Sequence, residues 1–180
     1  MSLENMNRAD EAILDERARI LARPILERQK DRGEHDCVIF TIKPEAYAID
    51  CRYVRRITRS AGMAPIPGTP PFVAGVIRVR EEIHSVFDLR ALLGGQRQAI
   101  TNDAKIIALG EQRIEFCLLA DEVTGITAIA ALDIHTRNSD RERDGKKFIH
   151  GVTNNAILVL DTLALLRDPN LYIGGDATRT

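Results

Sequence analysis

Two aspartates occupy equivalent places in the sequence, and carboxylates are natural candidates for acid–base chemistry. Asp88 follows "SVF" and Asp161 follows "LVL", and each precedes a short segment that contains "ALL". A carboxylate between a strand and a helical turn accepts hydrogen bonds from free backbone amides and favours the positive end of the helix dipole. The pattern therefore predicts that both aspartates are helix N-caps and not catalytic acids.

The other residue types that carry enzymatic or metal chemistry are scattered. The histidines and cysteines form no HExxH, CxxC or Cys–His pattern, and the chain has no GxxxxGK[ST] or GxGxxG segment. His84 alternates with apolar neighbours in "EIHSVF" and is expected to face the surface. Reduced, packed thiols are expected at the three cysteines. We therefore expect no enzymatic activity, no cofactor and no metal. The residues considered are His35, His84, His135, His150, Cys37, Cys51 and Cys117.

Composition and charge restrict the class of partner. The chain has 180 residues, 44% of them hydrophobic, and a net charge of -1, so it is long enough to bury a sizeable core. A balanced charge predicts no general attraction to nucleic acid or to an anionic membrane. The polar, acidic N-terminus does not resemble a secretion signal, and no run of apolar residues is long enough to span a membrane. We expect a cytoplasmic protein.

The periodicity of apolar residues changes near residue 36. Residues 8–30 place apolar side chains three and four positions apart, as in an amphipathic helix that Pro24 kinks or splits. This extension, residues 1–35, either packs on the rest of the protein or serves as a docking or dimerisation element. From residue 37 onward, short β-like runs alternate with turns, beginning with a hairpin through "KPEA".

Strand-like runs continue to the end of the chain. A proline-rich loop over 61–71 precedes runs at 72–79 and 83–87, and a hairpin through "GEQR" opens the second half. A charged surface loop, "HTRNSDRERDGKK", separates this half from "FIHGVT", "AILVL" and a short helix that ends at Pro169. Residues 169–180 are expected to form a C-terminal tail.

The two halves of the chain repeat with a period of about 70 residues. "IFTIKPEAYAI" aligns with "IIALGEQRIEF", "VRRIT" with "VTGIT", "FVAGV" with "FIHGV", and "DLRALL" with "DTLALL". Two copies are too few for a solenoid, which needs about three repeats. We expect two β-modules that pack together, over roughly 37–95 and 105–168, either side by side or intertwined.

Several of these segments together resemble the CheW-like domain of bacterial chemotaxis. They are "FTI" followed by "YAIDCRYVRRI", the loop and strand "PIPGTPPFVAGVIRVR", "FDLR", "DEV" at 121–123, and the closing "FIHGV" with "LVLD". The resemblance covers residues 36–168. It implies an all-β fold of two five-stranded SH3-like barrels, which agrees with the duplication.

The resemblance also implies a function and partners. Members of the family are non-catalytic adaptors that couple the cytoplasmic tip of a chemoreceptor to the histidine kinase CheA. The second barrel is expected to dock on the kinase regulatory domain, the first to contact a neighbouring kinase domain, and the receptor tip to enter a groove between the barrels. No cofactor, nucleic acid or membrane insertion is expected.

The family motifs place candidate partner-binding residues in this chain. The receptor-facing valine corresponds to Val54, a nearby acidic position to Arg56, and the turn arginine to Arg80. Val54 and Ile57 have the strand spacing of core residues. Arg80 is either a solvated turn residue or a partner of Glu81, or its planar guanidinium organises the groove between the barrels or grips a receptor carboxylate or backbone carbonyl. The full set of candidates is Val54, Arg56, Ile57, Arg78, Arg80 and Val123.

This chain departs from the family pattern at the turn "VREEI". Arg78 replaces the usual asparagine, Glu81 replaces a glycine, Ser85 replaces a proline, and Arg56 reverses the expected charge. Without the glycine, the turn lacks the residue best suited to positive φ at that position. These changes predict an adaptor tuned to a particular receptor or kinase. The alternative from another class is a small-ligand sensor that uses the groove between the barrels as its pocket.

Overall fold

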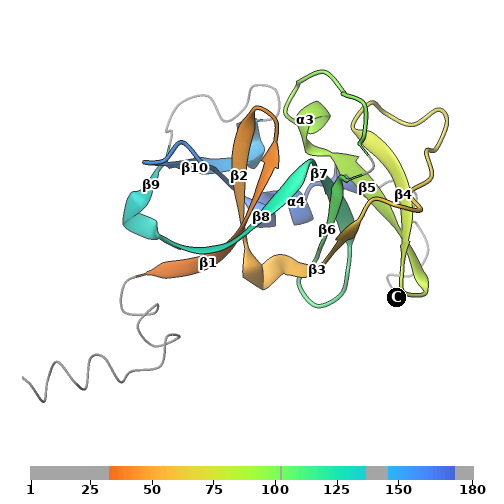
Figure 1. Cartoon of the computed structure of the whole chain (residues 1–180). Coiled ribbons are helices and arrows are strands. Elements are labelled where there is room, and N and C mark those ends of the chain that lie inside the picture. The colour runs from red at the N-terminus through yellow and green to blue at the C-terminus, as the bar shows by residue number, and fades with distance from the viewer. Residues whose placement is uncertain (1–32, 102, 137–145, 173–180) are drawn as a thin grey trace, which may run out of the picture. The chain divides into compact units, whose positions relative to one another are not determined.

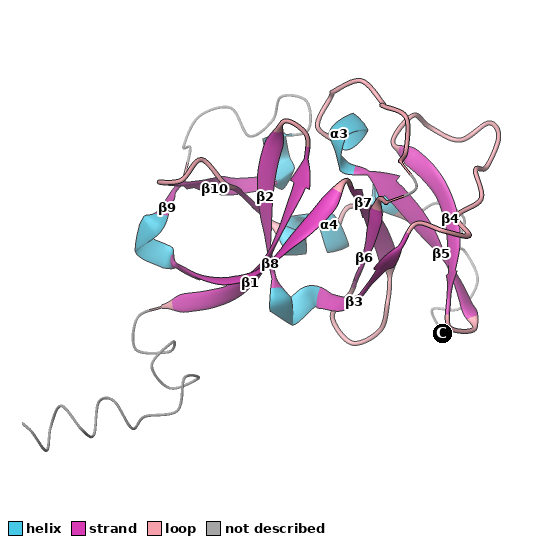
Figure 2. Ribbon diagram, in the orientation of Figure 1, coloured by secondary structure: helices cyan, strands magenta, loops and turns pink. Residues whose placement is uncertain are grey.

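A computed structural model describes residues 33–101, 103–136 and 146–172. The chain divides into two units between Glu34 and His35. The helix expected over residues 8–30 and most of the charged loop before residue 147 lie outside the described residues. Strands dominate the described part, and its helices are short (Figure 2). Among the described helices, none is both long and apolar enough to cross a membrane.

The first sheet has six strands in the order β8-β1-β2-β11-β10-β9 (Figure 1). β1 and β2 form the hairpin predicted through "KPEA", and Ile42 pairs with Glu45 across its turn. The two-residue strand β9 was not predicted. The bounds are β1 Glu34–Ile42, β2 Glu45–Asp50, β8 Glu122–Ala130, β9 Ile134–His135, β10 Ile149–Thr153 and β11 Leu158–Leu160.

The second sheet has five strands in the order β3-β6-β7-β5-β4. Both hairpins in it, β4–β5 and β6–β7, were predicted from their turns. The loop over 61–71 is irregular, as predicted, apart from one bridge between Ala64 and Val76. The bounds are β3 Val54–Arg59, β4 Val73–Val79, β5 Glu82–Asp88, β6 Lys105–Leu109 and β7 Phe116–Ala120.

The two sheets arrange equivalent strands of the repeat in the same order. The sequence alignment equates β3 with β8, the β6–β7 hairpin with β1–β2, β5 with β11, and β4 with β10. Read in these terms, β3-β6-β7-β5-β4 repeats the first five strands of β8-β1-β2-β11-β10-β9. The first sheet takes the β1–β2 hairpin from the first half of the chain and its other strands from the second half. The second sheet takes the β6–β7 hairpin from the second half and its other strands from the first half. Neither sheet is therefore made from one repeat alone.

The largest hydrophobic core is shared by the two sheets. Phe40 and Ile49 of the first sheet are in the same buried cluster as Phe87 and Leu118 of the second. Along β6 the side chains alternate, and Ile107 faces this cluster whereas its neighbour Ile106 faces a second one. Strands buried on both faces read as continuous apolar runs. The shared core holds the two sheets as one packed structure.

Both predicted helix caps are confirmed. Asp88 precedes α3, Leu89–Leu92, and its Oδ1 atom accepts a hydrogen bond of 2.9 Å from the Arg90 amide. Asp161 precedes α4, Thr162–Leu166, and its Oδ1 atom accepts one of 2.9 Å from the Ala164 amide. Single 3₁₀ turns complete the described structure at Cys51–Tyr53, Ala131–Asp133, Lys146–Phe148 and Pro169–Leu171.

Candidate functional site

A surface depression with a volume of about 590 Å³ lies on the second sheet. Three elements line it: strand β3, the β4–β5 turn with the start of β5, and the β6–β7 turn. Antiparallel pairing of β3 with β6 places these segments side by side, since Val54 pairs with Leu109 at the end that leads into the β6–β7 turn. We call it the arginine depression, and its lining residues are Arg55, Arg56, Val79, Arg80, Glu81, Glu82, His84, Gln112, Arg113 and Ile114.

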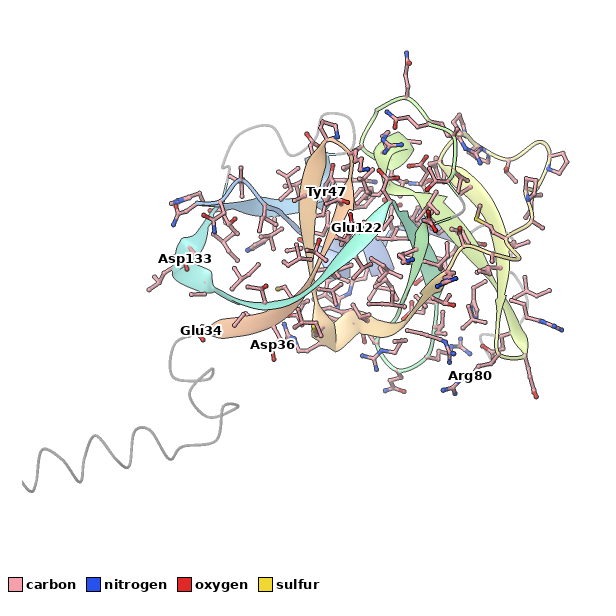
Figure 3. All side chains as sticks on the ribbon, viewed as in Figure 1. Glu34, Asp36, Tyr47, Arg80, Glu122 and Asp133 are labelled. Atoms are coloured by element: carbon pink, nitrogen blue, oxygen red, sulfur yellow. The ribbon has the colours of Figure 1, made fainter. Side chains whose placement is uncertain are left out.

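The structure brings two of the six predicted partner-binding residues together in this depression. Arg56, on β3, and Arg80, at the β4–β5 turn, both line it (Figure 3 labels Arg80). Ile57 and Arg78 are exposed elsewhere on β3 and β4. Val54 and Val123 occupy equivalent positions on β3 and β8, and both pack, half-buried, against the shared core. Their role in partner binding stays a prediction.

The β4–β5 turn places its backbone strain at Arg80. Arg80 has φ 58°, in the left-handed region, and Glu81 is not among the residues with positive φ. The sequence had suggested a mismatch at Glu81, where the family has glycine. A non-glycine residue with positive φ costs free energy and persists where the surroundings hold it. The strained position therefore belongs to the arginine that lines the depression.

Among the residues that the structure describes, the guanidinium groups of the depression have no acidic partner in an ion pair. Among the described residues, the ion pairs involve none of Arg56, Arg80 and Arg113. Arg55 donates a hydrogen bond to the Arg52 carbonyl oxygen. All four arginines of the depression are exposed. Their positive charges are therefore available to a ligand that approaches from solvent.

The prediction that His84 faces the surface is wrong. His84 is 7% exposed, whereas its neighbour Ile83 is 70% exposed. Side chains on a strand alternate between faces, so a shift of one residue in phase exchanges the buried and exposed sets. On β5 the side chains of His84 and Val86 face the protein interior, and that of Ile83 faces solvent. The Nε2 atom of His84 is buried without a hydrogen bond among the described residues, 3.5 Å from a Glu82 carboxylate oxygen.

A smaller depression, of about 250 Å³, lies beside the β1–β2 turn. Arg90 and Asp121 form an ion pair of 3.3 Å there, and the Lys43 amide donates a hydrogen bond of 2.8 Å to Asp121. Tyr47 donates its hydroxyl to Glu45, and burial together with this bond raises the pKa of Tyr47. These polar groups are paired with one another and fix the turn against α3 and β7.

Cys37 and Cys117 are buried, as predicted for packed thiols, and both are unsuited to thiolate chemistry. Burial raises the pKa of Cys117 to about 12. Burial, then the nearby Asp50 carboxylate, raise the pKa of Cys37 to about 12. Cys51 is half-buried, and burial also raises its pKa. In the described ranges, no three His, Cys, Asp or Glu side chains are grouped to hold a metal ion.

Sequence reasoning missed several residues of the arginine depression. Arg55, Gln112, Arg113 and Ile114 were not singled out, because the depression forms only where β3 pairs with β6 from the other half of the chain. The two arginines of the "VRRIT" segment were one available signal. Nothing local in "GEQR" indicates that Arg113 lies near them.

Comparison with known proteins places this fold in a family. The structure is similar to that of the scaffolding protein TtCheW from Thermoanaerobacter tengcongensis, with a TM-score of 0.61 and 24% identity over 70% of this chain and 88% of that one. "Chemotaxis protein CheW" of Bacillus subtilis (strain 168) is 25% identical over 132 residues, which are 72% of this chain and 85% of the relative. The protein of the same name in Thermotoga maritima is 27% identical over 133 residues, 71% and 85% of the two chains. The sequence model of the CheW-like domain family matches residues 36–170, and the chain therefore belongs to the CheW-like domain family.

Proposed function

We propose that this protein is a cytoplasmic, non-catalytic adaptor that couples chemoreceptors to the histidine kinase CheA. The observation that carries the proposal is the family match, which spans residues 36–170 and so includes nearly all of the described fold. The similar curated proteins are named for chemotaxis, and the similar structure is titled a scaffolding protein. An adaptor acts through its surfaces and needs no reactive group of its own.

The proposed architecture is a pair of five-stranded SH3-like barrels, each of which takes one hairpin from the other half of the chain, so the barrels are intertwined and do not coincide with residues 37–95 and 105–168. The repeated strand order of the two sheets supports this duplication. The core that both sheets share makes the two modules one packed structure, since packed interiors transmit displacement with little deformation. Two partners held on such a structure keep a fixed separation, and the free energy that couples their binding is then about 1–3 kcal/mol.

We propose that Val54, Arg56, Ile57, Arg78, Arg80 and Val123 contact the receptor or the kinase. Position in the sheets supports this assignment, because β3 and β8 are edge strands of their sheets. Ile57 on β3 is 39% exposed, and its repeat equivalent on β8, Ile126, is 67% exposed. Exposed apolar side chains on an edge strand suit a helix that docks through its own apolar stripe.

A binding experiment tests the adaptor function directly. Receptor tips and the CheA regulatory domain are immobilised separately, and retention of the full chain is measured on each. We expect both to retain it. Replacement of Ile57 by aspartate should lower retention on the receptor tip about tenfold, which corresponds to about 1.4 kcal/mol. Ile83→Asp is the matched control, because Ile83 is an exposed strand isoleucine outside the proposed contacts.

The same experiment separates the adaptor from a small-ligand sensor. A sensor would be retained by neither partner and would show a thermal shift with a small ligand. Retention on neither surface contradicts the proposed function. Equal losses for Ile57→Asp and Ile83→Asp would contradict the assignment of β3 to the receptor while leaving the adaptor role in place.

A further inference from the structure

We propose that the arginine depression binds an acidic peptide segment of a partner protein, one that presents several Asp or Glu side chains. The inference rests on the proposed function to the extent that the partner is one the adaptor assembles with. It adds a separate site with its own chemistry, built from residues that the six proposed contacts only partly include.

Local charge is the first argument for an acidic ligand. Four arginines and two glutamates line the depression, although the whole chain has a net charge of -1. The excess of positive charge is therefore a property of this place and not of the composition. Like charges held close together repel, and an arriving anion relieves that repulsion. Because Arg56, Arg80 and Arg113 form no ion pair among the described residues, their guanidinium groups remain able to bind carboxylates of a ligand.

The distribution of the arginines indicates a ligand with more than one carboxylate. Arg55 and Arg56 lie on β3, Arg80 on the β4–β5 turn and Arg113 on the β6–β7 turn. A guanidinium group binds a carboxylate with two parallel hydrogen bonds, so each element offers its own fork. Because the four side chains are exposed, one ion pair with each would be screened and weak. A segment that carries several carboxylates engages them together.

The base of the depression differs from its rim. Val79 and His84 are buried and Ile114 is half-buried, so apolar surface lies beneath the arginines. The Nε2 atom of His84 is a buried ring nitrogen without a hydrogen bond among the described residues, and a Glu82 carboxylate oxygen lies 3.5 Å from it. Buried polar atoms usually have a partner in the folded or bound state. Apolar contact below and charge above suit the aliphatic stem and the carboxylate of a glutamate.

The lining residues argue against a nucleotide or single-stranded nucleic acid. Sites for these ligands combine positive charge with aromatic side chains on which a base stacks. The ten residues that line the depression include no Phe, Tyr or Trp. His84 is the one ring among them, and its burial leaves no exposed face for stacking.

The test uses the full chain and a defined probe. The probe is a fluorescein-labelled peptide in which glutamate alternates with alanine, and its control has glutamine in place of glutamate. Fluorescence anisotropy reports binding at low and at physiological salt. We expect the acidic peptide to bind, its affinity to fall with added salt, and the glutamine peptide not to bind.

Arg56→Glu and Arg59→Glu form a matched pair of variants. Both arginines are exposed on β3, but only Arg56 lines the depression. Arg56→Glu should weaken the acidic peptide about tenfold or more, because it removes one fork and adds a repelling charge. Arg59→Glu changes the net charge equally and should weaken it less than about twofold. Circular dichroism of both variants checks that the fold is retained.

The other outcomes overturn either the inference or the adaptor function, and they distinguish between the two. Equal loss in the two variants would show a non-specific charge effect. Absence of binding by the wild-type chain would remove the site, and displacement of the peptide by pyrophosphate at lower concentration than by free peptide would assign the site to a small anion. If the receptor tip and the kinase domain both retain the chain but Arg56→Glu does not weaken binding of the acidic peptide, the inference is overturned and the adaptor function is unaffected. Peptide binding without retention on either partner would leave the site standing and contradict the adaptor.

Discussion

At the scale of single residues, Asp88 and Asp161 both cap a helix, but their surroundings differ. Asp88 is 3% exposed, and its Oδ2 atom is buried without a hydrogen bond among the described residues. Asp161 is half-buried, and its Oδ1 atom accepts the hydrogen bond from the Ala164 amide of α4. Removal of Asp161 therefore isolates the contribution of a cap, whereas removal of Asp88 also changes a buried carboxylate.

Asp161→Ala should lower the free energy of unfolding by about 1 kcal/mol, because the Ala164 amide loses its acceptor. Urea denaturation measures the change. Asp103→Ala is the control, since Asp103 is exposed and caps no helix, and it should stay within about 0.5 kcal/mol of wild type. No measurable difference between the two variants would contradict the assignment of Asp161 as a cap.

We expect Asp168 to make a pH-dependent contribution to the free energy of unfolding. Burial alone would raise its pKa, but hydrogen bonds from Lys147 and from Asn170 outweigh burial, and the pKa lies below its ordinary value of 3.8. A carboxyl group whose pKa is lower in the folded state stabilises the protein above its unfolded pKa. That contribution is lost as the pH falls through the folded pKa.

The difference in unfolding free energy between wild type and Asp168→Asn tests this sign. At pH 7 the variant should be less stable by about 1 kcal/mol, a value that allows for the exposure of Lys147. The difference should shrink as the pH falls below 3.8. Urea denaturation at a series of pH values measures it, and a difference that grows with acidity would contradict the direction of the shift.

At the scale of elements, one repeated glycine lets two strands be approached closely by another segment. Gly75 on β4 and Gly151 on β10 are equivalent in the repeat, and each lies where the strand register shifts. A Cβ atom on Gly75 would lie 2.3 Å from the Ala64 carbonyl oxygen. One on Gly151 would lie 2.8 Å from the His135 carbonyl oxygen. The glycines thus allow the proline-rich loop and β9 to pair with these strands.

Gly75→Ala and Gly125→Ala separate steric contact from backbone strain. Gly75 has φ 155° and Gly125 has φ 158°, but a Cβ on Gly125 would meet nothing within 4 Å. Gly75→Ala should cost about 3 kcal/mol, since strain and a clash add, and Gly125→Ala about 1 kcal/mol. Thermal and urea denaturation measure both. Equal costs would mean that the close approach of the loop is not what requires glycine.

Elements whose signals are local were predictable, and their partners were not. The caps, the three hairpins and the irregular loop each depend on residues next to one another in the sequence. The pairing of β3 with β6, and of β8 with β1, joins segments from different halves. No local pattern specifies which hairpin completes which sheet. The phase of β5 was missed for a related reason, because burial of His84 depends on what covers that face of the sheet.

At the scale of the whole molecule, the hairpin that each sheet takes from the other half of the chain explains why only part of the candidate site was predicted. Arg56 and Arg80 were identified from the family motif, but their proximity to Arg113 depends on the β6–β7 hairpin from the second half. The same exchange builds a core to which both sheets contribute. A protein built this way cannot move one sheet without disturbing the other, which suits a structure that holds two partners in register.

The adaptor function requires that this protein bridge its two proposed partners, and a capture experiment measures this directly. A chemoreceptor tip is fixed to a surface, and the CheA regulatory domain is passed over it with and without the full chain. The proposed adaptor function predicts that the kinase domain is retained only when the chain is present, and in proportion to the amount of chain bound. Equal retention of the kinase domain with and without the chain, or none in either case, would contradict it.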